Sequence, residues 1–466
     1  MRLALILVGA VCASSALAQQ LDLDDSSAGV CHYILNRWAA AEGNPAEGYA
    51  LDGYETVQEV TFSNGQPAVA LHVVETSAGH VRVESTSPAT GTLVQAFDGR
   101  IGWRSHSQWG MGPMSKGDIQ TLVAQARLDL AQDAIRSHPV TVLLPSETLD
   151  GHPCYVIRAS GRDPVDETWY FDKESHQRVK RVRPAAGGAP EMEMSFSDFR
   201  PTGGLTLPYT IRITAGTWAM TIRRSRLLIN PPVDEAGFVL TMDQLHEINT
   251  VKAILDRHAS VYGNAGEDQP PDDSRVVRWT VESSISGLRE QVTVSFRAPH
   301  LVRYEVDTPG MGRTWQVTNG QMGWEASDIL GFRELKPAEI ANVLGQANSY
   351  RLPRLADRLP LRRLVGERIV NGRHAVAVAL SSLAGPDGTY YFDRDTGRLL
   401  RYVPPRGRDT AGTVIDFSDF RAADGLEIPY VTTIRNYAGQ TVTRLQSIET
   451  GVPLADDLFV PPAADH

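Results

Sequence analysis

The chain has 466 residues, of which 42% are hydrophobic, 21% charged and 7% aromatic, a composition typical of ordinary globular domains and not of disordered or collagen-like proteins. Forty-five lysine and arginine residues stand against 55 aspartate and glutamate residues, so the formal net charge is -10. This balance argues against a nucleic-acid partner and against electrostatic attachment to an anionic membrane, because both depend on an excess of positive charge.

The chain begins with a pattern typical of a secretory signal peptide. Arg2 precedes an apolar run from Leu3 to Cys12, and a stretch of small residues ends at Ala18. We expect residues 1–18 to be a signal peptide that is cleaved after Ala18, with export to the periplasm. The apolar run is too short for a transmembrane helix, and no later stretch reaches the roughly 18 apolar residues that a span needs. We therefore expect no transmembrane segment.

A repeat at a constant offset of 221 residues, for example 319 − 98 = 221, organises the rest of the chain. The motif FDGRIGW at 97–103 matches TNGQMGW at 318–324, WYFD at 169–172 matches YYFD at 390–393, and FSDFR at 196–200 recurs at 417–421. Chance does not keep one offset over so many aromatic and turn positions. The repeat predicts two homologous domains, 19–240 and 241–466, each large enough to have its own core.

Within each copy the hydrophobic periodicity predicts the same order of elements. An amphipathic helix opens the copy, with apolar residues at helical spacing from Val30 to Trp38 and from Ile248 to Leu255. Alternating strands follow, then a segment of helical period at 118–128 and at 338–348, and then more strands joined by tight turns. We expect a mainly β fold with helices (α+β). It would contain two tandem curved antiparallel sheets, each with an N-terminal helix and a midway helix on its concave face.

Short motifs in both copies resemble those of a known family. They are the Asp/Asn-Gly-x-x-Gly-Trp hairpin, Tyr-Tyr-Phe-Asp-x-x-Thr-Gly-x-Leu at 390–399, Phe-Ser-Asp-Phe, Gly-Leu-x-Ile-Pro-Tyr at 425–430 and a closing Phe-Val-x-Pro. Together they resemble the outer-membrane lipoprotein-sorting proteins, the LolA-like half-barrel superfamily, over most of both copies. The resemblance implies two tandem half-barrels, each with a helical lid over a hydrophobic cavity that carries acyl chains.

The function that this resemblance implies is a periplasmic carrier or chaperone for lipid or for lipoprotein acyl chains, without catalysis and without a cofactor. Two alternatives remain open, an envelope sensor that binds a protein partner and a hydrolase with an unrecognised site. The chain lacks the common zinc-protease, thiol-redox, serine-hydrolase and phosphate-loop motifs, and none of its 12 histidines lies at the short spacing of a zinc site. We therefore predict no catalytic residue and no metal site.

Apolar segments that lead into the midway helices are the candidates for a ligand cavity or lid. They are Trp103, Trp109, Met111 and Met114 in the first copy and Trp324, Ile329, Leu330 and Phe332 in the second. Methionine and aromatic side chains suit an adaptable apolar mouth. A filled core under the helix fits the same pattern equally well, because an apolar stripe does not distinguish a cavity wall from a core.

Two cysteines remain after cleavage of the signal peptide, Cys31 and Cys154. An even pair in a compartment that permits disulfides predicts one bridge, which would close 154 − 31 = 123 residues. Two separate buried thiols are the alternative.

Arginines gather between 351 and 368 in an otherwise acidic chain. Because a guanidinium group binds carboxylate or phosphate with two hydrogen bonds, a lipid head group or an acidic partner could contact Arg354, Arg358 and Arg362. A solvated face is the alternative.

Four aspartates and one histidine recur at turn positions. We assign turn roles to Asp172 and Asp393 and to Asp198 and Asp419, because acid–base catalysis by a carboxylate pair needs both groups in one cleft. His176 stands where the second copy has Gly397, which predicts a left-handed backbone at both positions.

Overall fold

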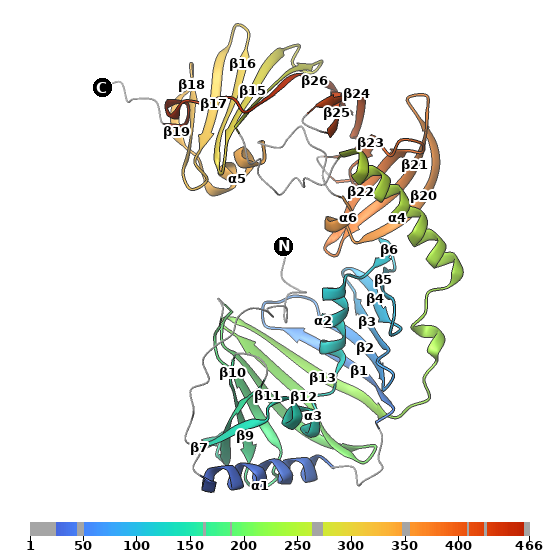
Figure 1. Cartoon of the computed structure of the whole chain (residues 1–466), viewed down its shortest axis with the longest axis vertical. Coiled ribbons are helices and arrows are strands. Elements are labelled where there is room, and N and C mark those ends of the chain that lie inside the picture. Colours follow the sequence, from blue (N-terminus) through green and yellow to red (C-terminus); the bar gives the residue numbers. More distant parts are fainter. Residues whose placement is uncertain are drawn as a thin grey trace. The chain divides into compact units, whose positions relative to one another are not determined.

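The structure is a computed structural model, and it describes residues 25–43, 51–161, 165–186, 189–262, 274–346, 355–407, 410–423 and 426–460. The predicted signal peptide, 1–18, lies outside these ranges. The chain divides into two compact units, whose elements are labelled in Figure 1. The first unit comprises Met1–Gln108 and Gly112–Thr241, and the second comprises Trp109–Met111 and Met242–His466.

The first unit is built on one antiparallel sheet. Its strands lie in the order β5-β4-β3-β2-β1-β13-β12-β11-β10-β9-β8-β7, and β6 follows β5 along the chain. Helix α1 begins the unit, α2 and α3 lie between β6 and β7, and the 3-10 helix η1 ends it. The bounds are α1 (Asp25–Glu42), β1 (Gly53–Phe62), β2 (Val69–Thr76), β3 (Val81–Ser87), β4 (Gly91–Phe97), β5 (Gly102–His106), β6 (Gly110–Pro113), α2 (Lys116–Ala126), α3 (Ala131–Ser137), β7 (Val140–Leu149), β8 (His152–Ser160), β9 (Glu167–Asp172), β10 (Arg178–Arg183), β11 (Met192–Thr202), β12 (Leu205–Ala215), β13 (Trp218–Ile229) and η1 (Glu235–Gly237).

The second unit repeats this order strand for strand. Its sheet runs β19-β18-β17-β16-β15-β14-β26-β25-β24-β23-β22-β21-β20. The bounds are α4 (Met242–Tyr262), β14 (Arg275–Ser283), β15 (Arg289–Arg297), β16 (Leu301–Thr308), β17 (Gly312–Thr318), β18 (Gly323–Ser327), β19 (Gly331–Glu334), α5 (Pro337–Gly345), α6 (Leu355–Arg358), β20 (Leu361–Val370), β21 (Arg373–Ser382), β22 (Gly385–Asp393), β23 (Leu399–Val403), β24 (Val414–Ala423), β25 (Leu426–Asn436), β26 (Gly439–Thr450) and η3 (Asp456–Phe459).

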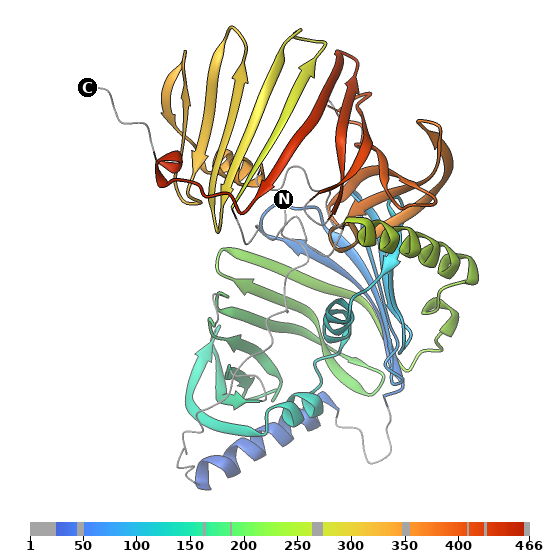
Figure 2. The same cartoon turned by 45° about the horizontal axis from the view of Figure 1, so that its top comes forward.

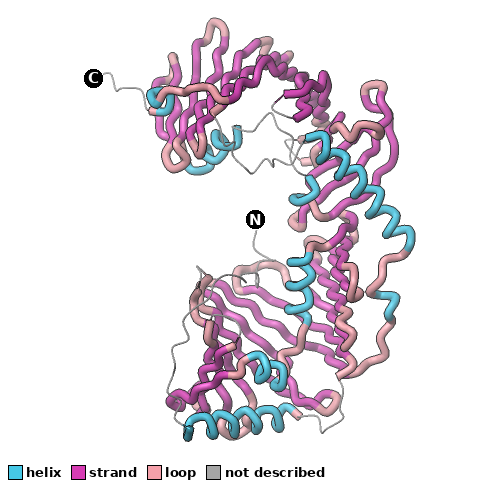
Figure 3. Tube along the Cα trace, in the orientation of Figure 1, coloured by secondary structure: helices cyan, strands magenta, loops and turns pink. Residues whose placement is uncertain are grey.

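The prediction of a mainly β fold with a few helices is confirmed (Figure 3). Helices α2 and α5 lie in the two segments where the sequence period changes from two to 3.6. Ser115 caps α2, since its hydroxyl accepts from the backbone N–H of Asp118 at 3.1 Å. Pro337 occupies the first turn of α5, where a missing N–H costs nothing.

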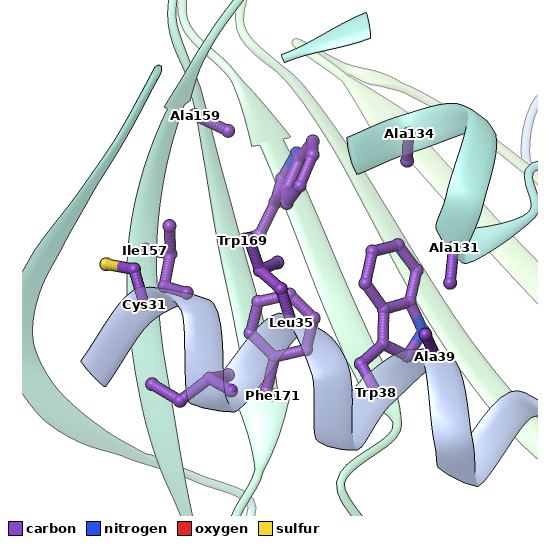
Figure 4. Packing of buried hydrophobic residues seen from close by; sticks show 11 residues of the cluster. Cys31, Leu35, Trp38, Ala39, Ala131, Ala134, Ile157, Ala159, Trp169 and Phe171 are labelled. Carbon is purple, nitrogen blue, oxygen red and sulfur yellow. The ribbon is translucent and has the colours of Figure 1, made fainter. Parts of the chain in front are cut away.

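Helix α1 packs against one end of the first sheet and forms a core of its own (Figure 4). Cys31, Ile34, Leu35 and Trp38 are all buried, as helical spacing requires of one apolar face. The ring of Trp38 lies 5.2 Å from the ring of Phe171. This cluster takes in residues of α3, β8 and β9 but none of α2, so α1 is anchored independently of the midway helix.

Asp172 and Asp393 have the turn roles that the sequence predicted, whereas Asp198 and Asp419 lie within strands, at an irregularity of the pairing. The carboxylate of Asp172 accepts from the backbone N–H and the hydroxyl of Ser175, at 2.7 and 2.8 Å, and Asp393 does the same with Thr396. Asp198 and Asp419 have φ of 55° and 52° at equivalent points of β11 and β24. His176 and Gly397 also share a left-handed backbone, with φ of 60° and 76°.

Cys31 and Cys154 are both buried free thiols, so the structure corrects the predicted disulfide. Cys31 shares a hydrogen bond with Thr141, whose backbone pairs with Ala159 of β8. Cys154 precedes Ala159 by 159 − 154 = 5 residues, which is about 17 Å along a strand. A disulfide needs Cα atoms within about 7 Å, and the even count of cysteines carried no information about this separation.

Candidate functional site

The first sheet has an apolar face that α2 covers, and the sheet bends around this helix (Figure 2). Leu122 and Ala126 of α2 are buried there, and Ile119 and Val123 are partly buried. The strands contribute large apolar side chains to the same cluster, among them Tyr54, Val73, Val81, Leu205, Leu207 and Leu227. One face of the short helix α2 therefore covers an apolar surface to which five strands contribute.

The second sheet has the same arrangement under α5. Ile340 and Val343 of the helix are buried against Val294, Phe296 and Val302 of β15 and β16. A neighbouring apolar cluster continues over the same sheet through Val277, Leu426 and Ile428. Both units thus place an amphipathic helix over an apolar sheet face.

Ion pairs hold the N-terminus of each covering helix to the sheet. In the first unit, Arg104 of β5 lies 2.5 Å from Asp118 in the first turn of α2. In the second unit the sheet arginine comes from the next strand: Arg333 of β19 lies 3.0 Å from Glu339 of α5 and 2.8 Å from Glu325 of β18. A carboxylate in the first helical turn also interacts favourably with the helix dipole.

A second set of ion pairs fixes the other end of α2. Asp129, three residues beyond the end of α2, accepts a hydrogen bond from Arg178 and lies 3.4 Å from Arg181, both on β10. Arg178 is 4% exposed, and its guanidinium carbon lies 4.5 Å from the centre of the Trp38 ring. Burial alone would raise the pKa of the Asp129 carboxyl, but the two arginines hold it below its usual value.

Further buried polar groups complete this cluster, which we call the β10 clamp (Glu42, Asp129, Glu167, Arg178 and Arg181). Arg181 lies 2.5 Å from Glu167, whose other oxygen accepts from the indole N–H of Trp169 at 3.0 Å. Glu42, at the end of α1, accepts from the backbone N–H of Ala131 at 2.8 Å. Burial raises the pKa of Glu42 to about 7.

The second unit has uncharged residues at the clamp positions. At the offset of 221, Arg178 corresponds to Leu399, Arg181 to Tyr402 and Glu167 to Gly388. Leu399 is buried in an aliphatic and aromatic cluster, and the Tyr402 hydroxyl donates to the Asp387 carbonyl at 2.8 Å. At these described positions, β23 therefore has no counterpart of the charged residues of the β10 clamp.

The structure places Trp103 and Trp324 on the sheet face opposite the covering helices, which corrects their assignment to a cavity wall. A Cβ added to Gly102 would lie 2.4 Å from Ile119 of α2, so Gly102 faces the helix and its neighbour Trp103 faces away. The indole N–H of Trp103 donates to the carbonyl of Phe238, after η1, at 2.7 Å. Trp324 packs with Phe459 of η3 in the same way.

The other predicted cavity residues are divided between two settings. Met114 is buried under α2, as a filled core requires. Trp109 and Met111 belong to the second compact unit rather than to the first. Ile329, Leu330 and Phe332 are 67%, 87% and 57% exposed, at the turn between β18 and β19. The structure therefore does not bring the eight residues together into one site.

The predicted arginine cluster is described only in part. Arg354 lies outside the described residues, and Arg358 ends α6. Arg362 donates to the carbonyl oxygen of Ala356 at 2.9 Å, so its guanidinium group helps to fix α6.

Two negative findings apply to the part of the chain that the structure describes. No group of three or more His, Cys, Asp or Glu side chains there could hold a metal ion. Among the same residues, no helix is both long and apolar enough to cross a bilayer.

No protein-family model and no curated protein matches the chain. The chain does resemble solved structures. A LolA superfamily protein from Nitrosomonas europaea is 16% identical, with a TM-score of 0.32 over 45% of this chain and 97% of that chain. A domain assigned as an outer membrane lipoprotein-sorting protein from Vibrio parahaemolyticus is 12% identical, with a TM-score of 0.32 over 46% and 96%. The MucA/MucB complex of Pseudomonas aeruginosa gives 12% identity and a TM-score of 0.18 over 67% and 96%.

The predicted resemblance to LolA-like proteins is confirmed by these matches, two of which cover about half of the chain each. At such identities the likeness concerns the fold alone. Ligand and partner are argued below from the residues of this chain.

Proposed function

We propose that the chain is a non-catalytic periplasmic carrier of hydrophobic ligands, lipid or lipoprotein acyl chains, built from two tandem half-barrel domains at 19–240 and 241–466. Helices α2 and α5 act as lids that leave the sheet when a ligand enters. The observation that carries the proposal is the pairing of an apolar sheet face with a short amphipathic helix held at its N-terminus by ion pairs.

The energies of burial allow an acyl chain to replace a lid. Helix α5 buries two large side chains fully, Ile340 and Val343, and Leu344 in part. At roughly 1.5–3 kcal/mol for each fully buried side chain, this amounts to about 5 kcal/mol. An acyl chain of about 14 methylene groups would gain about 11 kcal/mol at about 0.8 kcal/mol each. The excess of the burial free energy of the acyl chain over that of α5 can offset the entropy that the ligand loses on binding.

The two lids should differ in how easily they open. The β10 clamp holds the chain after α2, so opening the first lid by that end breaks buried ion pairs as well as apolar contacts. Helix α5 has only its N-terminal ion pairs among the described residues. We propose that ligand exchange takes place mainly in the second unit.

A lid and a filled core make opposite predictions for Val343→Ala. If α5 is a lid, the substitution favours the open state, and the apparent affinity for a fluorescent fatty-acid analogue rises about tenfold, because each 1.4 kcal/mol is a factor of ten. The matched control is Val378→Ala, at a residue 0% exposed in a different cluster of the same unit. It should lower stability without changing affinity.

The absence of saturable binding in the wild-type chain would contradict the proposal. Native mass spectrometry of protein purified from the periplasm gives a second test, since a carrier should retain extractable lipid. A co-purifying protein in place of lipid would favour the sensor, and turnover of an ester substrate would favour the hydrolase.

A further inference from the structure

Four consecutive hairpin turns lie along one end of the second sheet. They join β25 to β26 (437–438), β14 to β15 (284–288), β16 to β17 (309–311) and β18 to β19 (328–330). The antiparallel register brings them to the same end, since Ser283 before one turn pairs with Thr441 after another. Figure 2 shows the four turns side by side along the upper edge of the second sheet. We call this edge the apolar rim.

Each turn of the apolar rim exposes a large apolar side chain. The exposed fractions are 85% for Tyr437, 56% for Ile285, 55% for Met311, 67% for Ile329 and 87% for Leu330, with Phe332 beside them at 57%. Asp328 is the only charged residue within the four turns. A row of exposed apolar side chains on neighbouring turns with so little charge is typical of an interaction surface.

The first unit shows that hairpin geometry does not require these residues. At the offset of 221, Ile285 corresponds to Asn64, Met311 to Thr90, Ile329 to Gln108 and Tyr437 to Gly216. Three of the connections, β25–β26, β14–β15 and β16–β17, are thus made with polar or small residues in one copy and with apolar residues in the other. The fourth keeps large apolar residues in both copies, because Leu330 corresponds to Trp109 and Phe332 to Met111. The apolar side chains at the first three connections of the second copy need a reason outside the fold.

We infer that the apolar rim docks on the surface of a lipid bilayer. Its side chains stand on separate turns, which lie about 10 Å apart because two strands separate each turn from the next. A bilayer can accept each of these projecting tips between its head groups. Tyr437 suits the polar level of that interface, where its ring and hydroxyl are both accommodated.

The chemistry of the rim also specifies the kind of bilayer. The net charge of the chain is -10 and the turns carry almost no charge, so attraction to anionic lipid contributes little. Docking should therefore occur on neutral phosphatidylcholine and should depend little on salt. This inference does not require that either unit carries a ligand.

Flotation of the full chain with phosphatidylcholine vesicles tests the inference. The rim variant is Met311→Thr with Ile329→Gln, which installs the residues of the first unit. The matched control is Met322→Thr with Ile369→Gln, which removes the same side chains, both 59% exposed, elsewhere on the second unit. We expect the wild type and the control to float alike at 50 and 500 mM salt, and the rim variant to bind at least tenfold more weakly.

Three results would overturn the inference. Failure of the wild type to float would exclude a bilayer partner, as would equal flotation of the rim variant. A dimer in vesicle-free solution that the rim variant alone abolishes would assign the rim to a second copy of this chain. Circular dichroism of both variants verifies that the fold is retained, and Tyr437→Ser offers an independent rim substitution at a solvent-exposed turn.

Discussion

The two units share a strand order but differ in what surrounds their covering helices. In the first, the chain after α2 is held by ion pairs to β10, and three of the four turns that correspond to the rim are polar. In the second, Leu399 and Tyr402 replace the arginines, and the same edge is apolar. The comparison shows that two copies of one domain can keep the same strand pairing while the residues that surround their covering helices and their turns differ.

The largest expected effect comes from removing the clamp. Arg178→Leu installs the residue of the second unit, removes the cation beside the buried Glu42 and leaves Asp129 with Arg181 alone. We expect the first unit to lose about 3 to 5 kcal/mol of unfolding free energy. Hydrogen exchange of the full chain measures this for β9 and β10, with β22 and β23 as an internal reference. A loss below about 1 kcal/mol would show that the clamp is solvated.

Glu42 makes the stability of the first unit depend on pH. Its pKa is raised to about 7 by burial, above the usual value of 4.5, so the folded state binds a proton that the unfolded state has lost between these values. This stabilisation is complete below pH 4.5 and is lost as pH rises to 7, by about 3 kcal/mol in total. Burial also raises the pKa of Glu75, in the same unit, to about 7. Glu42→Gln should therefore reduce the slope in urea unfolding of the first unit, and the further change Glu75→Gln should remove the rest. A slope that Glu42→Gln leaves undiminished would refute the assignment to Glu42.

His258 makes the stability of the second unit depend on pH with the opposite sign. Burial lowers its pKa to about 4, although its hydrogen bond to the carbonyl of Gly397 acts the other way. Only the unfolded state binds this proton between pH 6.5 and 4, so stability present above 6.5 is lost as pH falls through this window, again by about 3 kcal/mol. Exchange rates in β22 and β23 should respond, and His258→Gln should remove the response. Equal slopes for this variant and the wild type would refute the assignment.

The smallest expected difference separates the two recurring tryptophans. Trp103 donates to the Phe238 carbonyl at 2.7 Å, whereas the indole nitrogen of Trp324 is buried with no hydrogen-bond partner among the described residues. Replacement by phenylalanine should therefore destabilise the first unit by about 1 kcal/mol more than the second. Thermal unfolding of both variants checks this, and equal costs would mean that packing alone determines them.

The sequence predicted an element correctly where only one face of that element is packed against the rest of the unit. The change of period predicted α2 and α5, and the aspartates at recurring turns predicted their hydrogen bonds. It failed for Trp103 because both faces of β5 are covered, one by α2 and the other by the segment around Phe238. Alternation says that Gly102 and Trp103 face opposite sides, but it does not say which side the helix occupies.

The β10 clamp was missed for a different reason. The run RVKRVR at 178–183 has the charge pattern of an exposed strand. The register shifts between Arg178 and Lys180, and this irregularity lets Arg178 and Arg181 both reach Asp129. Simple alternation would have placed the side chains of Arg178 and Lys180 on the same face of the strand. The four cations in six residues were the available signal, but locating their acidic partners required the fold.

Both free thiols belong to the first unit, and this gives the protein a built-in reporter. Burial raises the pKa of Cys31 and of Cys154, so each is a poor nucleophile while the unit is folded. A thiol reagent can modify them only when the first unit opens, and the second unit has no cysteine to react. The rate at which a thiol reagent labels Cys31 and Cys154 therefore reports the opening of one half of a duplicated molecule, without any introduced cysteine.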